Sequence, residues 1–220
     1  MQVTSAEAYR VLSQYYDDTP NALLDLEMRI LSQRMGSVEG LRILDAGCGT
    51  GRWMTWAVAR GARVFGVDAC FEMTQKAARK PGIAGRVTCA GISRIPLRDH
   101  AADLAICSFA IGYLPDARPA IEELARVARR VIVADLHPEA IRRGWTRSFR
   151  AAGELYEVEH YPHTAEELDE AACGEGLSRV WRTEPPFGEP ERGVFQRAGK
   201  EGAFSEVQDI PAILITEWTR

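Results

Sequence analysis

A glycine-rich segment and a carboxylate that follows it are the residues best suited to bind a ligand. Asp45-Ala-Gly-Cys-Gly-Thr-Gly51 lies between a short apolar run and a stretch with helical spacing, so it turns a strand sharply into a helix. Glycine permits the positive φ angles and the close backbone approach that such a turn needs. Asp68 ends the next apolar run, where its carboxylate can accept hydrogen bonds from a pair of ribose hydroxyls. Together these residues predict a site for a nucleoside-type cofactor.

Two other interpretations of this segment exist. A nicotinamide dinucleotide is bound by the spacing Gly-x-Gly-x-x-Gly, which seats a pyrophosphate on a helix N-terminus. The spacing here is Gly-x-Gly-x-Gly, which implies no phosphate. Glycine-rich turns also connect strands to helices in α/β proteins that bind nothing there, and in that case Asp68 only caps the next helix.

Asp135 ends the fifth apolar run, His137 follows it, and both are candidates for acid–base chemistry. Residues in this position lie at the carboxyl edge of a parallel sheet, where ligands bind. His137 is the candidate base, because an imidazole titrates near neutral pH, and Asp135 is placed to orient it or to contact a ligand. The alternative is that His137, which precedes a proline, is a loop residue that satisfies backbone groups.

Two further histidines, His160 and His163, lie in Glu157-Val-Glu-His-Tyr-Pro-His163. They either line a second ligand site or serve as exposed or helix-capping residues. Their spacing on an extended segment does not define a metal site without further ligands, and no Cys/His cluster in the sequence has zinc spacing. No metal is predicted.

An aromatic and basic segment, residues 138–163, interrupts the regular pattern of the chain. Its aromatic side chains offer an apolar wall with arginines nearby. Such a wall favours a flat or amphiphilic small molecule as the ligand, including a molecule that carries a negative group. The candidate substrate-binding residues are Tyr113, Trp145, Arg147 and Tyr156. The alternative is that the aromatic residues bury the segment against the sheet and that the arginines form a solvated face.

The elements that position these residues alternate between apolar runs and amphipathic stretches. Strands are predicted at 42–45, 63–68, 86–90, 104–108 and 131–135, with helices near 52–60, 71–79 and 117–129 between them. Two helices, at about 6–16 and 20–35, precede the first strand. Strands that alternate with helices form a parallel sheet through right-handed crossovers.

The C-terminal part departs from this alternation. Thr164-Ala-Glu-Glu167 is a capping box, so a helix begins there and runs towards Gly174 or Gly176. Strands are predicted at 177–181 and 212–218, joined by a long segment that contains prolines and glycines. Without a helix long enough for a crossover between them, this pair would be antiparallel.

The fold class predicted is α/β. It is a Rossmann-like, seven-stranded, mostly parallel sheet with an antiparallel last strand, helices on both faces and an N-terminal helical cap. One domain is expected over residues 1–220. Its parts are the cap (1–38), a cofactor-binding core (39–135), the insertion (138–163) and a C-terminal helix and strand pair (164–220).

Composition and charge exclude several classes of protein. The chain has 220 residues, of which 46% are hydrophobic and 26% charged, which is typical of a globular protein. Its net charge of -4 gives no basic footprint for a phosphate backbone, so nucleic acid is disfavoured as a partner. The sequence lacks a signal-peptide pattern and a membrane-spanning apolar run, and its five scattered cysteines favour reduced thiols. We therefore expect a cytoplasmic protein.

Three segments resemble successive motifs of class I S-adenosylmethionine (SAM)-dependent methyltransferases of the small-molecule type: LDAGCGTGR, VFGVDACFEM and IPLRDHAADLAICSFAIGYLPD. The resemblance is close over residues 10–135 and topological elsewhere. It implies that the chain binds SAM and releases S-adenosylhomocysteine (SAH). The residues implied are Asp45, Gly47, Cys48, Gly49 and Gly51 around the methionine and ribose, Asp68 at the ribose hydroxyls, Ala69, Met73 and Ile92 around the adenine, and Ser108 and Phe109 near the sulfonium.

The chain departs from this family in two places. Gly91 stands where relatives often have an acidic residue for the adenine amino group, and Gly112-Tyr113 stands where many have a His pair. The N-terminal Tyr15-Tyr16-Asp17-Asp18 resembles the cap that folds over SAM, so Tyr16 is a candidate contact for the sulfonium through cation–π attraction. Adjacent tyrosines before a helix are also common packing residues.

The resemblance implies an enzyme that transfers the methyl group of SAM to an O, N, S or C atom of a small-molecule acceptor. Transfer from a sulfonium is an in-line displacement, so the protein chiefly supplies alignment and desolvation. Two alternatives stay open. One is a SAM-binding partner subunit or sensor without catalysis, and the other is a methyltransferase that acts on a macromolecule.

Overall fold

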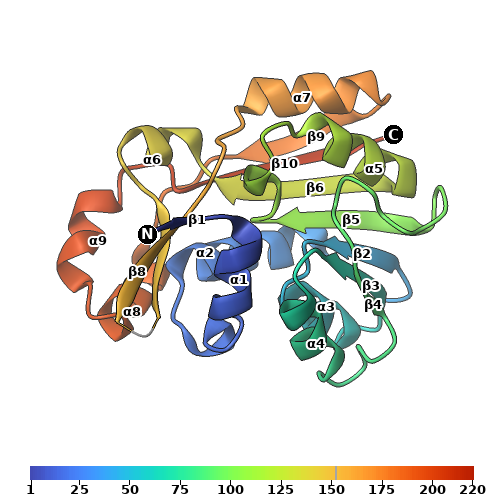
Figure 1. The fold of residues 1–220 in the computed structure, drawn as a ribbon. Coiled ribbons are helices and arrows are strands. Elements are labelled where there is room, and N and C mark those ends of the chain that lie inside the picture. Colours follow the sequence, from blue (N-terminus) through green and yellow to red (C-terminus); the bar gives the residue numbers. More distant parts are fainter. Residues whose placement is uncertain (152) are drawn as a thin grey trace.

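A computed structural model describes residues 1–151 and 153–220 of the protein. Its centre is a seven-stranded sheet with the order β4-β3-β2-β5-β6-β10-β9 (Figure 1). The first five of these are parallel to one another, whereas β10 is antiparallel to both β6 and β9. This arrangement confirms the predicted fold class. The strands are β2 (Arg42–Ala46), β3 (Arg63–Asp68), β4 (Val87–Cys89), β5 (Ala102–Ser108), β6 (Ala128–Leu136), β9 (Ser178–Thr183) and β10 (Ile213–Thr219).

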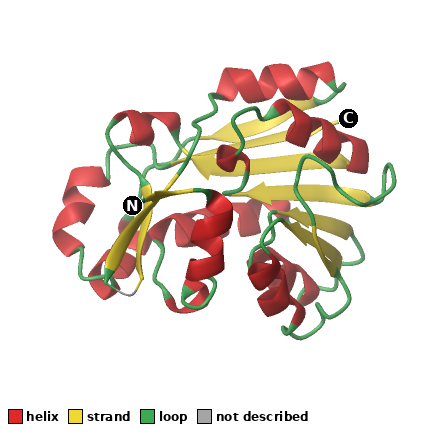
Figure 2. Ribbon diagram, viewed as in Figure 1, coloured by secondary structure: helices red, strands yellow, loops and turns green. Residues whose placement is uncertain are grey.

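Helices cover both faces of this sheet (Figure 2). On β5, Leu104 and Ile106 belong to the apolar cluster on one face, and Ala105 and Cys107 belong to the cluster on the other. Successive side chains therefore point to opposite faces, and both faces are buried. This is why the parallel strands appear in the sequence as continuous apolar runs. The helices on one face are α5 (Arg118–Val127) and α7 (Ala165–Gly174), and those on the other include α2 (Ala22–Met35), α3 (Arg52–Val58) and α4 (Phe71–Ala78).

A helical cap precedes the sheet. It consists of α1 (Ser5–Leu12) and the short 3-10 helix η1 (Tyr16–Asp18), followed by α2. A capping box begins α1, because the Thr4 side chain accepts from the Glu7 backbone and the Glu7 carboxylate accepts from the Thr4 N–H at 3.0 Å. The cap lies beside the carboxyl ends of β5 and β6 (Figure 1).

The segment 138–163 builds a second, smaller sheet at the same edge. After α6 (Pro138–Arg142), the chain forms an antiparallel hairpin from β7 (Arg147–Ala151) and β8 (Glu154–Val158). The N-terminal β1 (Gln2–Val3) pairs with β8 in parallel, which gives the order β1-β8-β7. A two-residue strand carries no periodic signal, so the sequence did not predict this sheet.

Two helices that the sequence did not predict lie between β9 and β10, namely α8 (Glu189–Arg197) and α9 (Glu201–Val207). The sequence predicted a long segment here that contains prolines and glycines, without a helix long enough for a crossover, and the structure forms these two short helices within it. Pro190 lies in the first turn of α8, where a missing N–H costs nothing, and the Glu191 carboxylate accepts from the Gly188 N–H at 2.9 Å. The strands are nonetheless antiparallel, as predicted.

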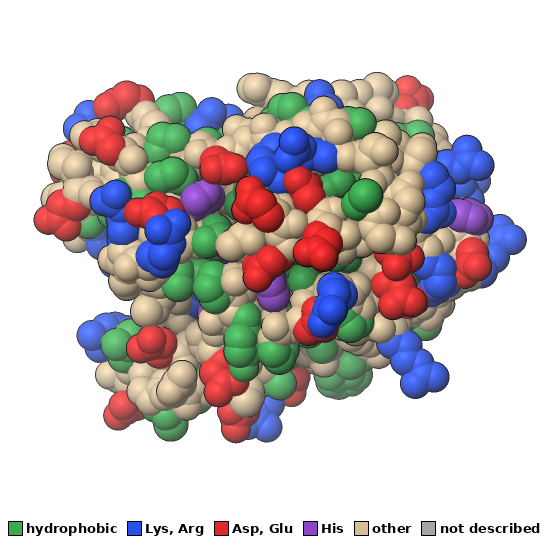
Figure 3. Space-filling view, turned by 90° about the horizontal axis from the view of Figure 1, so that it is seen from above, with side chains coloured by type: hydrophobic (Ala, Val, Ile, Leu, Met, Phe, Trp, Pro, Cys, Tyr) green, Lys and Arg blue, Asp and Glu red, His purple; other side chains and the backbone are tan. Residues whose placement is uncertain are grey.

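The surface over α5 and α7 carries acidic and basic side chains interspersed with each other (Figure 3). Each of the five cysteines is a free thiol. Among the helices described, none is both long and apolar enough to cross a membrane.

Candidate functional site

The glycine loop connects β2 to α3 with three left-handed glycines. Gly47, Gly49 and Gly51 have φ angles of 77°, 52° and 84°. The Gly47 N–H donates to the Val67 carbonyl at 2.8 Å, which ties the loop to the end of β3. A Cβ at Gly47 would lie 2.3 Å from the Cβ of Ala110, so a side chain does not fit there. The loop therefore presents backbone at this edge of the sheet, as the sequence predicted.

Asp68 is bonded directly to this loop. One carboxylate oxygen accepts from the Gly49 N–H and the other from the Cys70 N–H, both at 2.8 Å. Burial raises the pKa of Asp68, and these two backbone hydrogen bonds oppose that rise. The carboxylate is thus held in a fixed orientation beside the loop, with lone pairs left for a ligand.

The residues expected to flank an adenine lie around Asp68 on three different segments. Ala69 follows β3 and is exposed, Met73 is buried in α4, and Ile92 is buried after β4. Gly91 stands where an acidic residue was expected from the resemblance. It is exposed, and a Cβ there would meet nothing within 4 Å.

Asp45 is a buried carboxylate on β2 next to the loop. It is 2% exposed, and its Oδ2 has no hydrogen-bond partner among the described residues. Burial raises its pKa to about 7, with Glu27 and Asp68 adding to the rise and Arg52 opposing it. An unpaired buried acceptor is costly, so the atom is suited to accept a hydrogen bond from a ligand.

A partly buried ion pair that the sequence did not predict connects the end of the glycine loop to α2. Arg52, at the start of α3, pairs with Glu27 of α2, whose side chain is fully buried. The Trp53 indole N–H also donates to Glu27 at 3.2 Å, and Arg52 donates to Ser108 Oγ at 3.0 Å. Ser108, a predicted cofactor contact, is thereby linked to the glycine-loop helix.

The cap is attached to the glycine loop through Asp17. Its carboxylate accepts from Thr50 Oγ1 at 2.5 Å and pairs with Lys80 at 3.1 Å. Its neighbour Tyr16 is mostly buried, and burial raises the pKa of that phenol to about 12. Tyr16 therefore stays protonated, next to the loop and at the wall of the cavity described below.

A second group of polar residues gathers at the carboxyl ends of β5 and β6. Asp135 is 7% exposed and accepts from Gly112 N–H at 2.7 Å and Leu136 N–H at 2.6 Å. It also pairs with Arg147 of β7 and contacts His160 Nε2 at 3.3 Å. Burial alone would raise the pKa of Asp135, but Arg147 and His160 outweigh burial and lower it well below its ordinary value.

Two tyrosines extend this network to the cap. Arg147 donates to Tyr113 Oη at 2.9 Å, and the hydroxyls of Tyr113 and Tyr9 lie 2.6 Å apart. Burial raises the pKa of both phenols, so both stay protonated near neutral pH. The network of Asp135, Arg147, Tyr113 and Tyr9 thus joins β6, β7, η2 (Ile111–Tyr113) and α1.

His160 occupies the space that a side chain at position 112 would take. A Cβ on Gly112 would lie 2.3 Å from His160 Nε2 and 2.8 Å from Asp135 Oδ2. The chain therefore has an imidazole near the position where relatives carry a His pair, supplied from a distant segment. His163, by contrast, contacts the Leu114 carbonyl through Nε2 at 2.9 Å.

Gly112→Ala tests this packing. We expect the substitution to lower the free energy of unfolding by about 1–3 kcal/mol, because it overpacks a buried site. Gly91→Ala is the matched control, since open space surrounds that position. Urea unfolding measures both. The double variant Gly112→Ala, His160→Ala should recover only part of the stability that Gly112→Ala loses, because the new Cβ would still lie 2.8 Å from Asp135 Oδ2. Equal stability of Gly112→Ala and the wild type would contradict the packing.

His137 does not join this network. It is the N-cap of α6, where its Nδ1 accepts from the Glu139 N–H at 3.0 Å, and its Nε2 lies 3.2 Å from Glu184. It does not line the cavity described below. Both ring nitrogens are engaged elsewhere, so the geometry gives His137 a capping role and separates it from Asp135.

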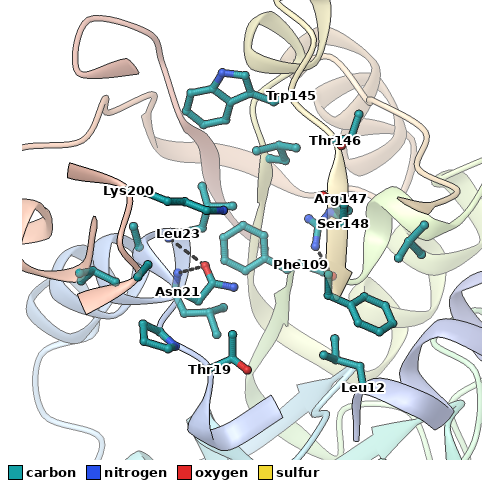
Figure 4. A pocket seen from close by; sticks show the side chains of 18 of the residues that line it. Leu12, Thr19, Asn21, Leu23, Phe109, Trp145, Thr146, Arg147, Ser148 and Lys200 are labelled. Carbon is teal, nitrogen blue, oxygen red and sulfur yellow. Dashed lines mark hydrogen bonds between the residues drawn. The ribbon is translucent and has the colours of Figure 1, made fainter. Parts of the chain in front are cut away.

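A cavity of about 730 Å³ lies between the cap, the β7–β8 hairpin and the α8–α9 pair (Figure 4). It reaches the main sheet at Phe109 and Leu136, which lie at the ends of β5 and β6. Phe109 has a left-handed backbone (φ 52°), a strained conformation for a bulky residue that is common at functional sites. Its N–H donates to the Ala134 carbonyl at 2.7 Å, and Arg147 lies over its ring.

Of the predicted acceptor residues, Tyr113, Trp145 and Arg147 line this cavity. Tyr156 does not, but it stacks on Phe149, which does, with the ring centroids 5.0 Å apart. The sequence did not predict the wall formed by α8 and α9. Among the described residues, no three or more His, Cys, Asp or Glu side chains gather as a metal site would require.

Comparisons with known proteins place this site in context. Residues 44–131 match the family model described as a methyltransferase domain. Malonyl-[acyl-carrier protein] O-methyltransferase from Hamiltonella defensa subsp. Acyrthosiphon pisum (strain 5AT) is 32% identical over 124 residues, which are 56% of this chain and 47% of that protein. The chain spans about half the length of the curated relatives it matches.

Solved structures share the fold. A SAM-dependent methyltransferase from Mesorhizobium loti has a TM-score of 0.69 at 22% identity, over 88% of this chain and 97% of that one. Geranyl diphosphate C-methyltransferase from Streptomyces coelicolor A3(2), solved with Mg²⁺, geranyl diphosphate and SAH, has a TM-score of 0.66 at 19% identity, over 89% and 79% of the two chains.

Proposed function

We propose, on the premise that residues 44–131 form a methyltransferase domain of the class I SAM-dependent type, that this protein transfers the methyl group of SAM to a small-molecule acceptor. The acceptor atom is O, N, S or C. The proposal rests on the connection between a loop suited to a nucleoside and a mostly apolar cavity. Tyr16 and Phe109 line the cavity, and their neighbours Asp17 and Ala110 contact the loop at Thr50 and Gly47. Donor and acceptor would thus be brought together at the inner end of the cavity, where Phe109 and Leu136 are buried.

The residues around the glycine loop fit SAM. The loop offers backbone at Gly47, where a side chain does not fit, and the Asp68 carboxylate beside it suits two ribose hydroxyls. The buried Asp45 Oδ2 has no partner among the described residues and suits the ammonium of the methionine part. When bound, SAM supplies a methyl group activated by its sulfonium.

The residues of the chain position the acceptor and exclude water. Phe109 and Leu136 form the end of the cavity at the sheet, so an acceptor there is desolvated. Tyr113, held by Arg147 and Tyr9, offers a protonated hydroxyl that orients an acceptor atom. Asp135 acts one step further away, because it fixes Arg147.

The binding of SAM should depend on pH through Asp45. Its pKa is raised to about 7 in the free protein, so its neutral form stabilises the fold at low pH and that contribution is lost as pH rises through 7. The ammonium of SAM favours the carboxylate instead. We therefore expect affinity to fall by up to about tenfold per pH unit below the pKa. Calorimetry measures this, and Asp45→Asn should remove the dependence. Wild-type affinity that does not change with pH would contradict this role.

The release of SAH tests catalysis. The protein is incubated with SAM and with fractionated metabolite extracts, and SAH is quantified by mass spectrometry. We expect SAH to form with at least one fraction, together with a product heavier by one methyl group. Binding of SAM without SAH release from any fraction would favour the non-catalytic SAM-binding subunit or sensor.

A further inference from the structure

We infer that the acceptor is an anionic amphiphile, whose apolar body fills the cavity and whose negatively charged group binds Lys200. The inference rests on the proposed function, because it names the chemical class of acceptor for the same site.

The wall is predominantly apolar and aromatic. Trp145 stacks on Phe187 with ring centroids 5.7 Å apart, and Phe187 meets Phe195 edge to face at 5.1 Å. Leu23 and Leu136 add aliphatic surface from α2 and the end of β6. A cavity of about 730 Å³ with such a wall suits a ligand whose main contact is apolar.

The charged residues of the wall are all basic. The chain as a whole has more Asp and Glu than Lys and Arg, 31 against 27. Yet no Asp or Glu is among the described residues that line the cavity, whereas Arg147, Arg150 and Lys200 are. This bias opposes the net charge of the chain, so it favours a ligand with negative charge.

Lys200 and Arg150 are the cations of this wall that form no ion pair among the described residues, and both side chains are exposed, so both are free to meet this charge. The charge of Arg147 is already neutralised by Asp135, which does not line the cavity. No carboxylate of the described chain lies within 4 Å of Lys200 Nζ, and the adjacent Glu201 accepts from Gln196 at 2.9 Å. The amine points into the cavity from the side opposite Arg147 and Ser148 (Figure 4). Arg150, exposed on β7, adds to the positive charge.

This placement separates two ends of the acceptor. The end that receives the methyl group lies at Phe109 and Tyr113, by the main sheet, and the anionic end lies at the α8–α9 turn that carries Lys200. The apolar body spans the aromatic wall between them.

Three ten-carbon probes test the inference: decanoate, decanol and decyltrimethylammonium, each titrated calorimetrically below its micelle concentration with SAH present. We expect decanoate to bind the wild type about tenfold or more tightly than decanol. Lys200→Gln should remove most of that preference and leave decanol binding unchanged, and Lys200→Glu should favour the cationic probe. Arg197→Gln is the matched control, because it removes the same charge from the end of α8, outside the wall.

Two results would overturn the inference: equal binding of decanoate and decanol by the wild type, or an equal loss of both probes in Lys200→Gln. Either result leaves the proposed function standing if SAH still binds. A protein that prefers decanoate but binds neither SAM nor SAH contradicts the proposed function instead, so the two failures are distinguishable.

Discussion

Replacing Asp68 by Ala is expected to weaken the binding of SAM about 100-fold, which corresponds to about 2.8 kcal/mol. The carboxylate is proposed to accept both ribose hydroxyls, and it also holds the glycine loop through Gly49. Its removal therefore costs ligand contacts and the order of the loop together. Calorimetric titration of SAM into the wild type and the variant measures the change.

Asp103→Ala is the matched control for this prediction. Asp103 is a carboxylate at the amino end of β5, on the opposite edge of the sheet, where it pairs with Arg42. Asp68→Asn retains one acceptor oxygen and should bind SAM with intermediate affinity. Melting curves establish that each variant is folded. An Asp68→Ala protein that is folded and binds SAM as tightly as the wild type would remove Asp68 from the site.

Replacing Arg147 by Met is expected to destabilise the protein by about 3–5 kcal/mol, because it leaves the buried Asp135 without its counter-charge. Arg147 and Asp135 have side chains that are 12% and 10% exposed. Without the guanidinium, burial raises the pKa of Asp135. The loss of stability should therefore be greatest at the higher pH values, at which the Asp135 carboxylate is ionised in the unfolded chain. Urea unfolding followed by tryptophan fluorescence, at several pH values, measures this.

The double variant Asp135→Asn, Arg147→Met separates a charge effect from a packing effect. It removes both charges together, so we expect it to be more stable than Arg147→Met alone. Arg118→Met controls for the loss of an arginine, because Arg118 pairs with Asp116 at the surface and contributes little. If Arg147→Met unfolds at the same urea concentration as the wild type, the pair does not stabilise the fold.

The sheet and the glycine loop could be predicted because their signals are local. The strand over 63–68 coincides with β3, and the capping box at Thr164 begins α7. In each case a few adjacent residues determine the backbone, through apolar alternation or side-chain capping. The match of residues 44–131 to a methyltransferase domain agrees with the same stretch.

The network around Asp135 could not be predicted in the same way. Its partners Arg147 and His160 come from 12 and 25 positions away, and Tyr9 from the far end of the chain. The two residues are close in sequence, so Asp135 was predicted to orient His137, but His137 caps α6. Gly112 was the one local indication of this network. A glycine beside a buried carboxylate leaves space for a side chain from another segment, and His160 fills that space.

The wall that carries Lys200 was missed for a different reason. Prolines and glycines at 185–193 indicate turns when they are taken singly, yet Pro190 and Glu191 begin a helix. Whether such residues end a helix or begin one depends on the burial of the residues after them, and here the apolar Val194 and Phe204 of α8 and α9 are buried. Tertiary burial decided the structure of this segment.

A calorimetric titration of the wild-type protein with SAM and, separately, with SAH tests whether the chain binds this cofactor and its product. We expect both to bind at micromolar concentration, with one molecule per chain, and both to raise the melting temperature. The absence of binding by either compound at about 1 mM, which is far above the concentrations at which a dedicated site is half-filled, would contradict this expectation.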